Sequence, residues 1–257
     1  MARMPLLAGN WKMHKDHLEA IQLVQQIAYH LDEQDYDRSE IVVIPPFTAL
    51  RSIQTLIDGD RLAIGLGAQD CYPEDSGAFT GAISPVMLAK LAVRYVVCGH
   101  SERRHIFGDD DQTVNRKVQA VLANGMRPIL CVGETDEERE QGQAEEIVAR
   151  HVIRGLDGVA GDRADDVVIA YEPVWAIGTG KTATPSDANE MCGFARSQVA
   201  EVLGGDAAVS IRVQYGGSVK PGNVAELMAQ SEIDGALVGG ASLQADDFAA
   251  ICRYHRL

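Results

Sequence analysis

The chain has 257 residues, of which 46% are hydrophobic and 23% are charged, so it is long enough to bury one large core or two smaller ones. Its formal net charge of −14 argues against nucleic acid or an anionic membrane surface as a partner, because both attract basic proteins. Its five cysteines form no Cys-x-x-Cys pair, which favours a reducing cytoplasmic compartment, and no apolar run reaches the roughly 18 residues that span a bilayer.

Short apolar runs recur along the whole sequence, and each is continuous rather than alternating. Runs of this kind are typical of strands that are buried on both faces of a parallel sheet. The expected strands lie within residues 5–10, 41–46, 62–68, 94–99, 127–133, 167–172, 209–216 and 235–240.

Longer amphipathic segments lie between these runs and predict helices. One expected apolar stripe contains Leu18, Ile21, Val24, Ala28 and Leu31, and another contains Met191, Ala195, Val199 and Val202. The strict alternation of strand and helix, repeated about eight times without a linker, predicts parallel strands in one domain spanning residues 1–257. The length fits an eight-stranded (β/α)8 barrel, with a doubly wound open sheet as the alternative.

Polar residues and glycines follow several of the expected strands. They are Asn10, Lys12, His100, Glu172, Gly216-Gly217-Ser218 and Gly239-Gly240. Because the carboxyl ends of parallel strands meet at the ligand-binding edge in both candidate folds, these groups are expected to share one rim.

The segment after Glu172 combines apolar residues with glycines and predicts a lid that closes over a ligand and excludes water. The expected lid consists of Pro173, Val174, Trp175, Ala176, Ile177, Gly178, Thr179, Gly180 and Lys181. The alternative is an ordinary surface loop whose Trp175 packs on the barrel.

Two nucleotide-binding patterns in this segment fail on spacing. Gly180-Lys181-Thr182 lacks the glycine that a P-loop requires five positions earlier, where Trp175 stands. Gly178-x-Gly180-x-x-Ala183 matches a loose dinucleotide fingerprint, but Pro173 to Ile177 separate it from the preceding strand.

Six sequence blocks, in the same order along the chain, resemble the triosephosphate isomerase family. They are GNWKM (9–13), GAFTG (77–81), CGHSERR (98–104), AYEPVWAIGTGK (170–181), YGGSV (215–219) and LVGGAS (237–242). The resemblance implies a TIM barrel, usually a homodimer, that interconverts dihydroxyacetone phosphate and D-glyceraldehyde 3-phosphate without metal or organic cofactor.

The resemblance also assigns roles to the rim residues. Glu172 matches the family's catalytic base, and its apolar cover would raise its basicity by desolvation. His100 matches the electrophile, and a helix starting after it would favour a neutral ring. Lys12 and Asn10 match residues that touch substrate, and Glu102 is expected to position Lys12. Backbone amides at Gly178, Ser218, Gly239 and Gly240 are expected to bind the phosphate.

Other features bear on partners. The spacing of His14 and His17 suggests a metal site only weakly, because no further ligand stands at useful spacing. The long segment 70–84 carries Phe79 and Thr80, and by resemblance it inserts into a second subunit of a homodimer. Ala82 departs from the family, which commonly has glutamate there to pair with an arginine that matches Arg103.

Two other functional classes remain open on the residues alone. One is a barrel isomerase or lyase that acts on a different sugar phosphate, which predicts a different base or a missing lid. The other is a non-catalytic binding protein of the same fold, which predicts the loss of Lys12, His100 or Glu172. All three residues are present in this chain.

Overall fold

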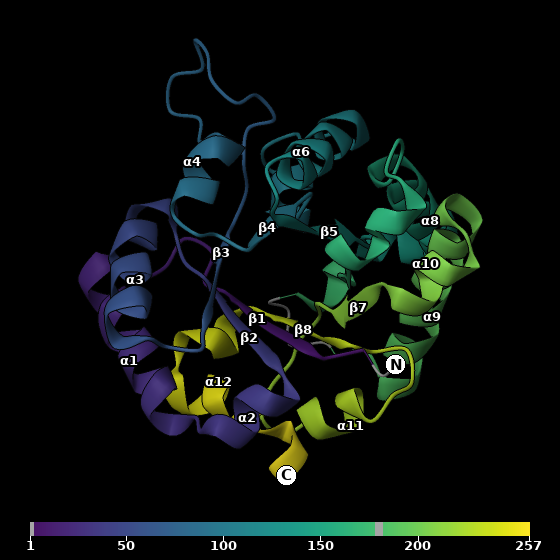
Figure 1. The fold of residues 1–257 in the computed structure, drawn as a ribbon. Helices are drawn as coiled ribbons and strands as arrows, with labels where there is room; N and C mark the ends of the chain where they lie inside the picture. The colour runs from purple at the N-terminus through teal and green to yellow at the C-terminus, as the bar shows by residue number, and fades with distance from the viewer. Residues whose placement is uncertain (1–2, 178–181) are drawn as a thin grey trace.

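The computed structural model describes residues 3–177 and 182–257, and its centre is a closed barrel of parallel strands (Figure 1). The strands follow one another around the barrel in chain order, and the first pairs with the last through Leu6 and Gly235. Their bounds are β1 Leu6–Asn10, β2 Glu40–Ile44, β3 Gly65–Ala68, β4 Tyr95–Cys98, β5 Arg127–Val132, β6 Val168–Tyr171, β7 Arg212–Tyr215 and β8 Gly235–Val238. The fold is therefore the (β/α)8 barrel that the alternation predicts, and the doubly wound sheet is wrong.

Helices surround the barrel and connect its strands (Figure 1). The α-helices are α1 His17–His30, α2 Glu33–Arg38, α3 Phe47–Asp60, α4 Pro85–Lys90, α5 Ser101–His105, α6 Asp111–Ala123, α7 Asp136–Glu140, α8 Ala144–Gly155, α9 Pro185–Leu203, α10 Gly205–Ser210, α11 Val224–Met228 and α12 Ala245–Cys252. Short 3-10 helices are η1 Gly161–Asp166, η2 Val174–Ala176, η3 Gly240–Leu243 and η4 Tyr254–Arg256. Thr184 caps α9 in a reciprocal capping box with Asp187.

Alternation along each strand divides the core into two parts. Leu6 and Ala8 of β1 belong to a cluster inside the barrel, whereas Leu7 belongs to the larger cluster between strands and helices. Both faces of the strands are thus buried, which is why their sequences read as continuous apolar runs.

Two predictions about the elements were wrong in detail. Leu18 is 59% exposed, and the buried stripe of α1 runs through Ala20, Leu23, Val24 and Ile27. The expected strand at 209–216 begins late, because Val209 and Ser210 end α10 and β7 starts at Arg212. In the second α-helical stripe, Met191, Ala195 and Val199 are buried as expected.

A long connection between β3 and α4 extends away from the barrel (Figure 1). Its exposed stretch includes Phe79, which is 42% exposed and packs against the ring of Tyr72 with centroids 4.4 Å apart. Gly77 precedes this tip with φ of +147°, a backbone conformation that favours glycine. No helix among the described residues is long and apolar enough to cross a membrane.

Candidate active site

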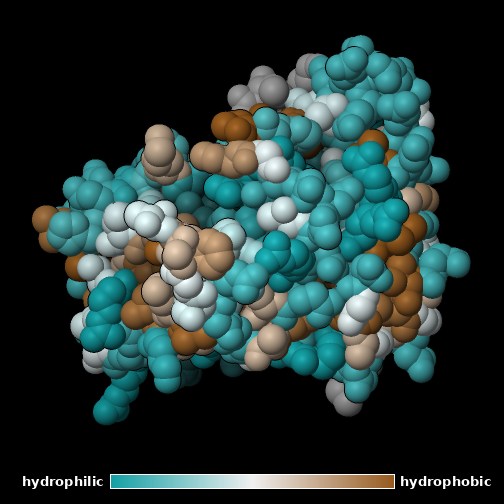
Figure 2. Space-filling model, turned by 90° about the horizontal axis from the view of Figure 1, so that it is seen from above, coloured by the Kyte–Doolittle hydropathy of each residue, from teal (hydrophilic) through white to brown (hydrophobic). Residues whose placement is uncertain are grey.

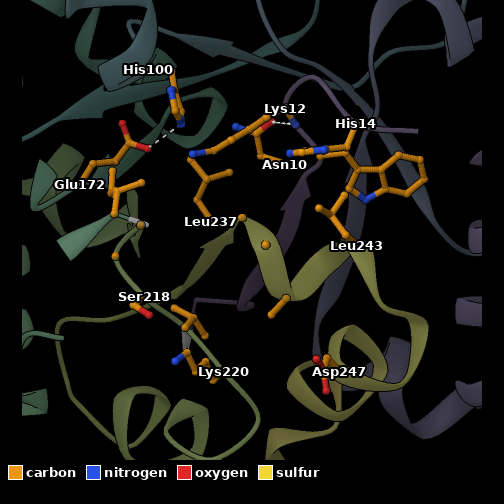
Figure 3. A pocket seen from close by; sticks show the side chains of 18 of the residues that line it. Asn10, Lys12, His14, His100, Glu172, Ser218, Lys220, Leu237, Leu243 and Asp247 are labelled. Carbon is orange, nitrogen blue, oxygen red and sulfur yellow. Dashed lines mark hydrogen bonds and ion pairs between the residues drawn. The ribbon is translucent and has the colours of Figure 1, made fainter. Parts of the chain in front are cut away.

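A cavity of about 770 Å³ opens at the carboxyl ends of the strands and contains most of the residues that the sequence places on the rim. Asn10, Lys12, His100, Glu172, Ser218, Gly239 and Gly240 all line it (Figure 3). Asn10 is the last residue of β1, and the others follow β1, β4, β6, β7 and β8, so the barrel gathers groups that are up to 230 residues apart in sequence.

Glu172 directly follows β6 and is 2% exposed. Its carboxylate accepts a hydrogen bond from the backbone N–H of Ser101 at 3.1 Å, and its Oε1 lies 3.2 Å from Nε2 of His100. A Cβ on Gly216 would lie 2.8 Å from Cγ of Glu172, so only glycine leaves room for the acid in this position. The site therefore contains a carboxylate that is almost fully buried and fixed in position by its neighbours.

His100 caps the N-terminus of α5 with its ring, and it is 5% exposed. Nδ1 accepts a hydrogen bond from the backbone N–H of Glu102 at 3.2 Å, so this nitrogen carries no proton. The geometry assigns the proton of a neutral imidazole to Nε2, which points toward Glu172 (Figure 3). The expected neutral ring thus has a specific hydrogen-bond cause in addition to the helix end.

Lys12 stands beside these two groups in a left-handed backbone conformation with φ of +51°. Its Nζ lies 2.9 Å from Oε1 of Glu102, the contact that the expected positioning role of Glu102 requires. Asn10 accepts the backbone N–H of Lys12 at 3.0 Å, and Gln69 donates to the Lys12 carbonyl at 2.7 Å. Neighbouring side chains therefore fix a non-glycine residue in a strained conformation, as is common at functional sites.

The rest of the cavity lining includes the residues that are expected to bind the phosphate. Ser218 follows β7, and Gly239-Gly240 open the short helix η3 after β8, as expected. Asn223 braces the turn after β7: its amide donates to the Ser218 carbonyl at 2.9 Å, and its Oδ1 accepts the Lys220 N–H at 2.8 Å. Gly178, the fourth predicted phosphate residue, lies outside the described residues.

The first half of the expected lid is described, whereas Gly178, Thr179, Gly180 and Lys181 lie outside the described residues. Val174 to Ala176 form η2, and Ile177 lines the cavity. The indole of Trp175 donates to Glu134 at 2.9 Å, and the hydroxyl of Tyr171 lies 3.1 Å from both oxygens of the same carboxylate. Glu134 is fully buried, so it anchors this segment to the loop after β5.

Sequence reasoning missed Glu134, Gln69, Ser101 and Asn223. Glu134 had a usable signal, because it is an acid two residues beyond the end of β5, in the same kind of position as Glu172. Ser101 contributes through its backbone N–H, and Asn223 and Gln69 act on backbone atoms, so none of their side chains marks a reaction chemistry in the sequence.

Three further residues, Cys131, His14 and Arg103, differ in their surroundings. Cys131 belongs to the cluster inside the barrel, and burial raises the pKa of its thiol well above its usual value, as suits a core residue. His14 lines the cavity, and no group of three potential metal ligands occurs among residues 3–177 and 182–257. By the resemblance, Arg103 matches an arginine that pairs with a glutamate at the position of Ala82. Here Arg103 pairs with Asp109 at 3.2 Å and with Asp70 at 3.3 Å.

The surface seen from above is mostly hydrophilic, with apolar residues gathered in small groups (Figure 2). The strongly exposed large apolar side chains include Met13, Phe79, Met87, Ile106 and Phe107. Met13 follows Lys12 directly and is 94% exposed, which leaves an apolar side chain in water next to the cavity.

Comparison with known proteins gives one consistent result. A family model described as triosephosphate isomerase matches residues 5–255. The triosephosphate isomerase of Saccharopolyspora erythraea is 56% identical over 248 residues, covering 96% of this chain and 95% of the relative. That of Chloroflexus aurantiacus is 55% identical over 252 residues, covering 98% and 99%, and that of Streptomyces avermitilis is 54% identical over 253 residues, covering 98% of each.

Proposed function

The chain belongs to the triosephosphate isomerase family, and we propose that it interconverts dihydroxyacetone phosphate and D-glyceraldehyde 3-phosphate with Glu172, His100 and Lys12 as catalytic residues. The observation that carries the proposal is the buried pair of Glu172 and a neutral His100, 3.2 Å apart in a cavity that Lys12 also lines. Such a pair combines a base and a hydrogen-bond donor without a net positive charge on the ring.

In the reaction, Glu172 takes a proton from the carbon next to the carbonyl, and the electron pair left behind forms an enediolate. His100 donates its Nε2 hydrogen bond to the substrate oxygens, where negative charge develops, and Lys12 stabilises the same charge. A proton then passes from the substrate's hydroxyl oxygen to the former carbonyl oxygen, next to Nε2 of His100, and Glu172 returns its proton to the neighbouring carbon, so that the carbonyl forms on the carbon that first lost the proton. In the structure the Nε2 of His100 faces Glu172, so bound substrate must take over that contact.

The phosphate would be bound by backbone amides of Ser218, Gly239 and Gly240, with Gly178 contributing from the lid. The support is that all three described residues line the cavity and that η3 begins at Gly240, leaving free N–H groups at its start. Asn10 would contact the substrate beside Lys12.

We also propose that residues 173–181 close over the substrate, with Trp175 and Glu134 as the anchor. Deletion of residues 176–180 is expected to leave a folded barrel that releases more methylglyoxal and inorganic phosphate per isomerisation, because an exposed enediolate eliminates phosphate. An unchanged ratio of side product to isomerisation would show that this segment is not a lid.

A homodimer is the proposed assembly. The segment around Phe79 and Thr80 projects from the barrel, and the side chain of Met13 next to the cavity is exposed to solvent. By the family resemblance, Thr80 of one subunit approaches the Lys12 region of the other. Thr80→Arg should therefore produce monomers in sedimentation, with activity falling as dimer is lost. A fully active monomeric unmodified protein would contradict this proposal.

The test of the activity is a coupled assay on the purified protein with D-glyceraldehyde 3-phosphate, before and after exhaustive chelation. Full activity is expected in both cases, because the proposed steps use only side chains and backbone amides, without a metal or organic cofactor. Strict dependence on an added metal ion would contradict the proposal. Free, buried cysteines support the proposed cytoplasmic location.

A further inference from the structure

We infer that Lys220 is a second cation of the substrate site, which attracts the phosphate group of an incoming substrate and strengthens its binding. This inference rests on the proposed function and names a residue that the catalytic steps do not use. Lys220 lines the same cavity as Lys12, and Figure 3 shows it near Ser218, on the side of the cavity away from Lys12.

The charges that line the cavity are unfavourable for a dianion without Lys220. Lys12 is already paired with Glu102 at 2.9 Å, and the carboxylates of Glu172 and Asp247 also line the cavity. The whole chain adds a formal net charge of −14. Within residues 3–177 and 182–257, Lys220 has no ion-pair partner, so its charge is available to a ligand.

The turn that carries Lys220 is fixed rather than loose. Asn223 accepts the Lys220 N–H at 2.8 Å and donates to the Ser218 carbonyl at 2.9 Å, so one side chain holds both ends of the segment Ser218–Lys220. The Lys220 carbonyl in turn accepts the N–H of Val224 at the start of α11. The backbone that carries the Lys220 side chain is therefore held close to Ser218, and the side chain lies apart from Glu172 and His100 (Figure 3).

This placement predicts an effect on capture and binding, with little effect on the chemical step. Lys220 is exposed, so its field reaches a substrate that is still in solution, and salt screens that field. The Debye length is about 30 Å at 0.01 M ionic strength and about 8 Å at 0.15 M, so the two conditions separate a long-range charge effect from a short-range contact.

The experiment compares Lys220→Met, Lys220→Arg and Lys220→Glu with the unmodified protein at these two ionic strengths. Lys90→Met is the matched control, because Lys90 is exposed at the end of α4 and does not line the cavity. The readouts are kcat and kcat/KM for D-glyceraldehyde 3-phosphate, and the affinity for inorganic phosphate measured by calorimetry.

Lys220→Met should lower kcat/KM by about three- to tenfold at low ionic strength and by less at 0.15 M, with kcat unchanged. Lys220→Glu should have a larger effect, Lys220→Arg should restore most of the loss, and phosphate affinity should follow the same order. Equal behaviour of Lys220→Met and Lys90→Met in both readouts would overturn the inference, as would an equal loss of kcat and kcat/KM. Should the unmodified protein lack isomerase activity while its phosphate affinity still depends on Lys220, the proposed function would fail and the cation site would stand.

Discussion

The two sides of the cavity differ in the groups that they offer to a ligand. On the catalytic side, ionisable side chains are held in place: Glu172 contacts the ring of His100 and the N–H of Ser101, and Glu102 contacts the His100 ring through its N–H and Lys12 through its carboxylate. On the phosphate side, the expected ligands are backbone amides beside glycines, and a Cβ on Gly240 would meet nothing within 4 Å. The catalytic side is therefore organised before substrate arrives, whereas the phosphate side keeps room that the substrate itself must fill.

The largest effect is expected from removing the base. Glu172→Gln keeps the shape of the side chain but loses its ability to accept a proton from carbon, so kcat should fall by on the order of 10³-fold. Affinity for inorganic phosphate, measured by calorimetry, should change little because the phosphate side is untouched. A kcat close to that of the unmodified protein would show that another residue takes the proton.

Crowding the catalytic side should cost activity without removing any catalytic group. In Gly216→Ala the new methyl would lie 2.8 Å from Cγ of Glu172, so the carboxylate must leave its present position. A misplacement of about 1 Å can cost on the order of 10²-fold, and kcat should drop accordingly.

Gly222→Ala is the matched control for this crowding, because its Cβ would have open space in the same turn. It should leave kcat within about twofold of the unmodified value, as expected for a substitution without a steric consequence. If the two alanine variants have the same kcat, the catalytic side is flexible enough to accommodate the added methyl without loss of activity.

The packing beneath the catalytic side should make stability depend on pH. Burial lowers the pKa of His151 to about 2, and Arg104, Arg150 and His105 add to the shift by repelling a second charge. The ring accepts the N–H of Gly133 at 3.4 Å, and Asp111, at 3.9 Å, faces it without reversing the shift. His151 therefore stays neutral in the folded protein, whereas it is protonated below about pH 6.5 when unfolded.

The sign follows from this difference in bound protons. Because the unfolded state binds the extra proton, stability should be complete above pH 6.5 and should fall as the pH is lowered, by about 2 kcal/mol at pH 5. The check is denaturant unfolding at pH 7.5, 6.5 and 5 for the unmodified protein and for His151→Gln. The variant should lose less free energy of unfolding between pH 6.5 and pH 5, and parallel curves would contradict the assignment to His151.

The barrel could be predicted from the sequence, because buried strands appear as continuous apolar runs and the helices between them as amphipathic segments. It also placed Asn10, Lys12, His100, Glu172 and Ser218 correctly in one cavity, since the topology brings strand ends together. The error at Leu18 has a physical reason: several apolar residues of α1 fit a helical period, and the packing partner decides which of them are buried.

Contacts that depend on backbone atoms were beyond the sequence. The N–H of Ser101 binds Glu172, and the N–H of Glu102 sets the tautomer of His100. Almost every residue type has such a backbone N–H, so the side chains at these positions do not predict the two contacts. The pairing of Arg103 with Asp70 and Asp109 likewise depends on how β3 and α5 approach one another, which periodicity does not specify.

The smallest effect is expected on the phosphate side, from Asn223→Ala. The substitution removes two hydrogen bonds that hold the Ser218–Lys220 segment, and each such bond contributes about 1 kcal/mol. Because the segment can still reach the same conformation when phosphate binds, KM should rise by about three- to tenfold while kcat stays nearly constant. Asn189→Ala is the control, since Asn189 also accepts a backbone N–H, that of Glu232, away from the cavity. Steady-state kinetics in which Asn223→Ala lowers kcat as strongly as it raises KM would mean that the phosphate side takes part in organising the catalytic side, and the two could no longer be treated as separate.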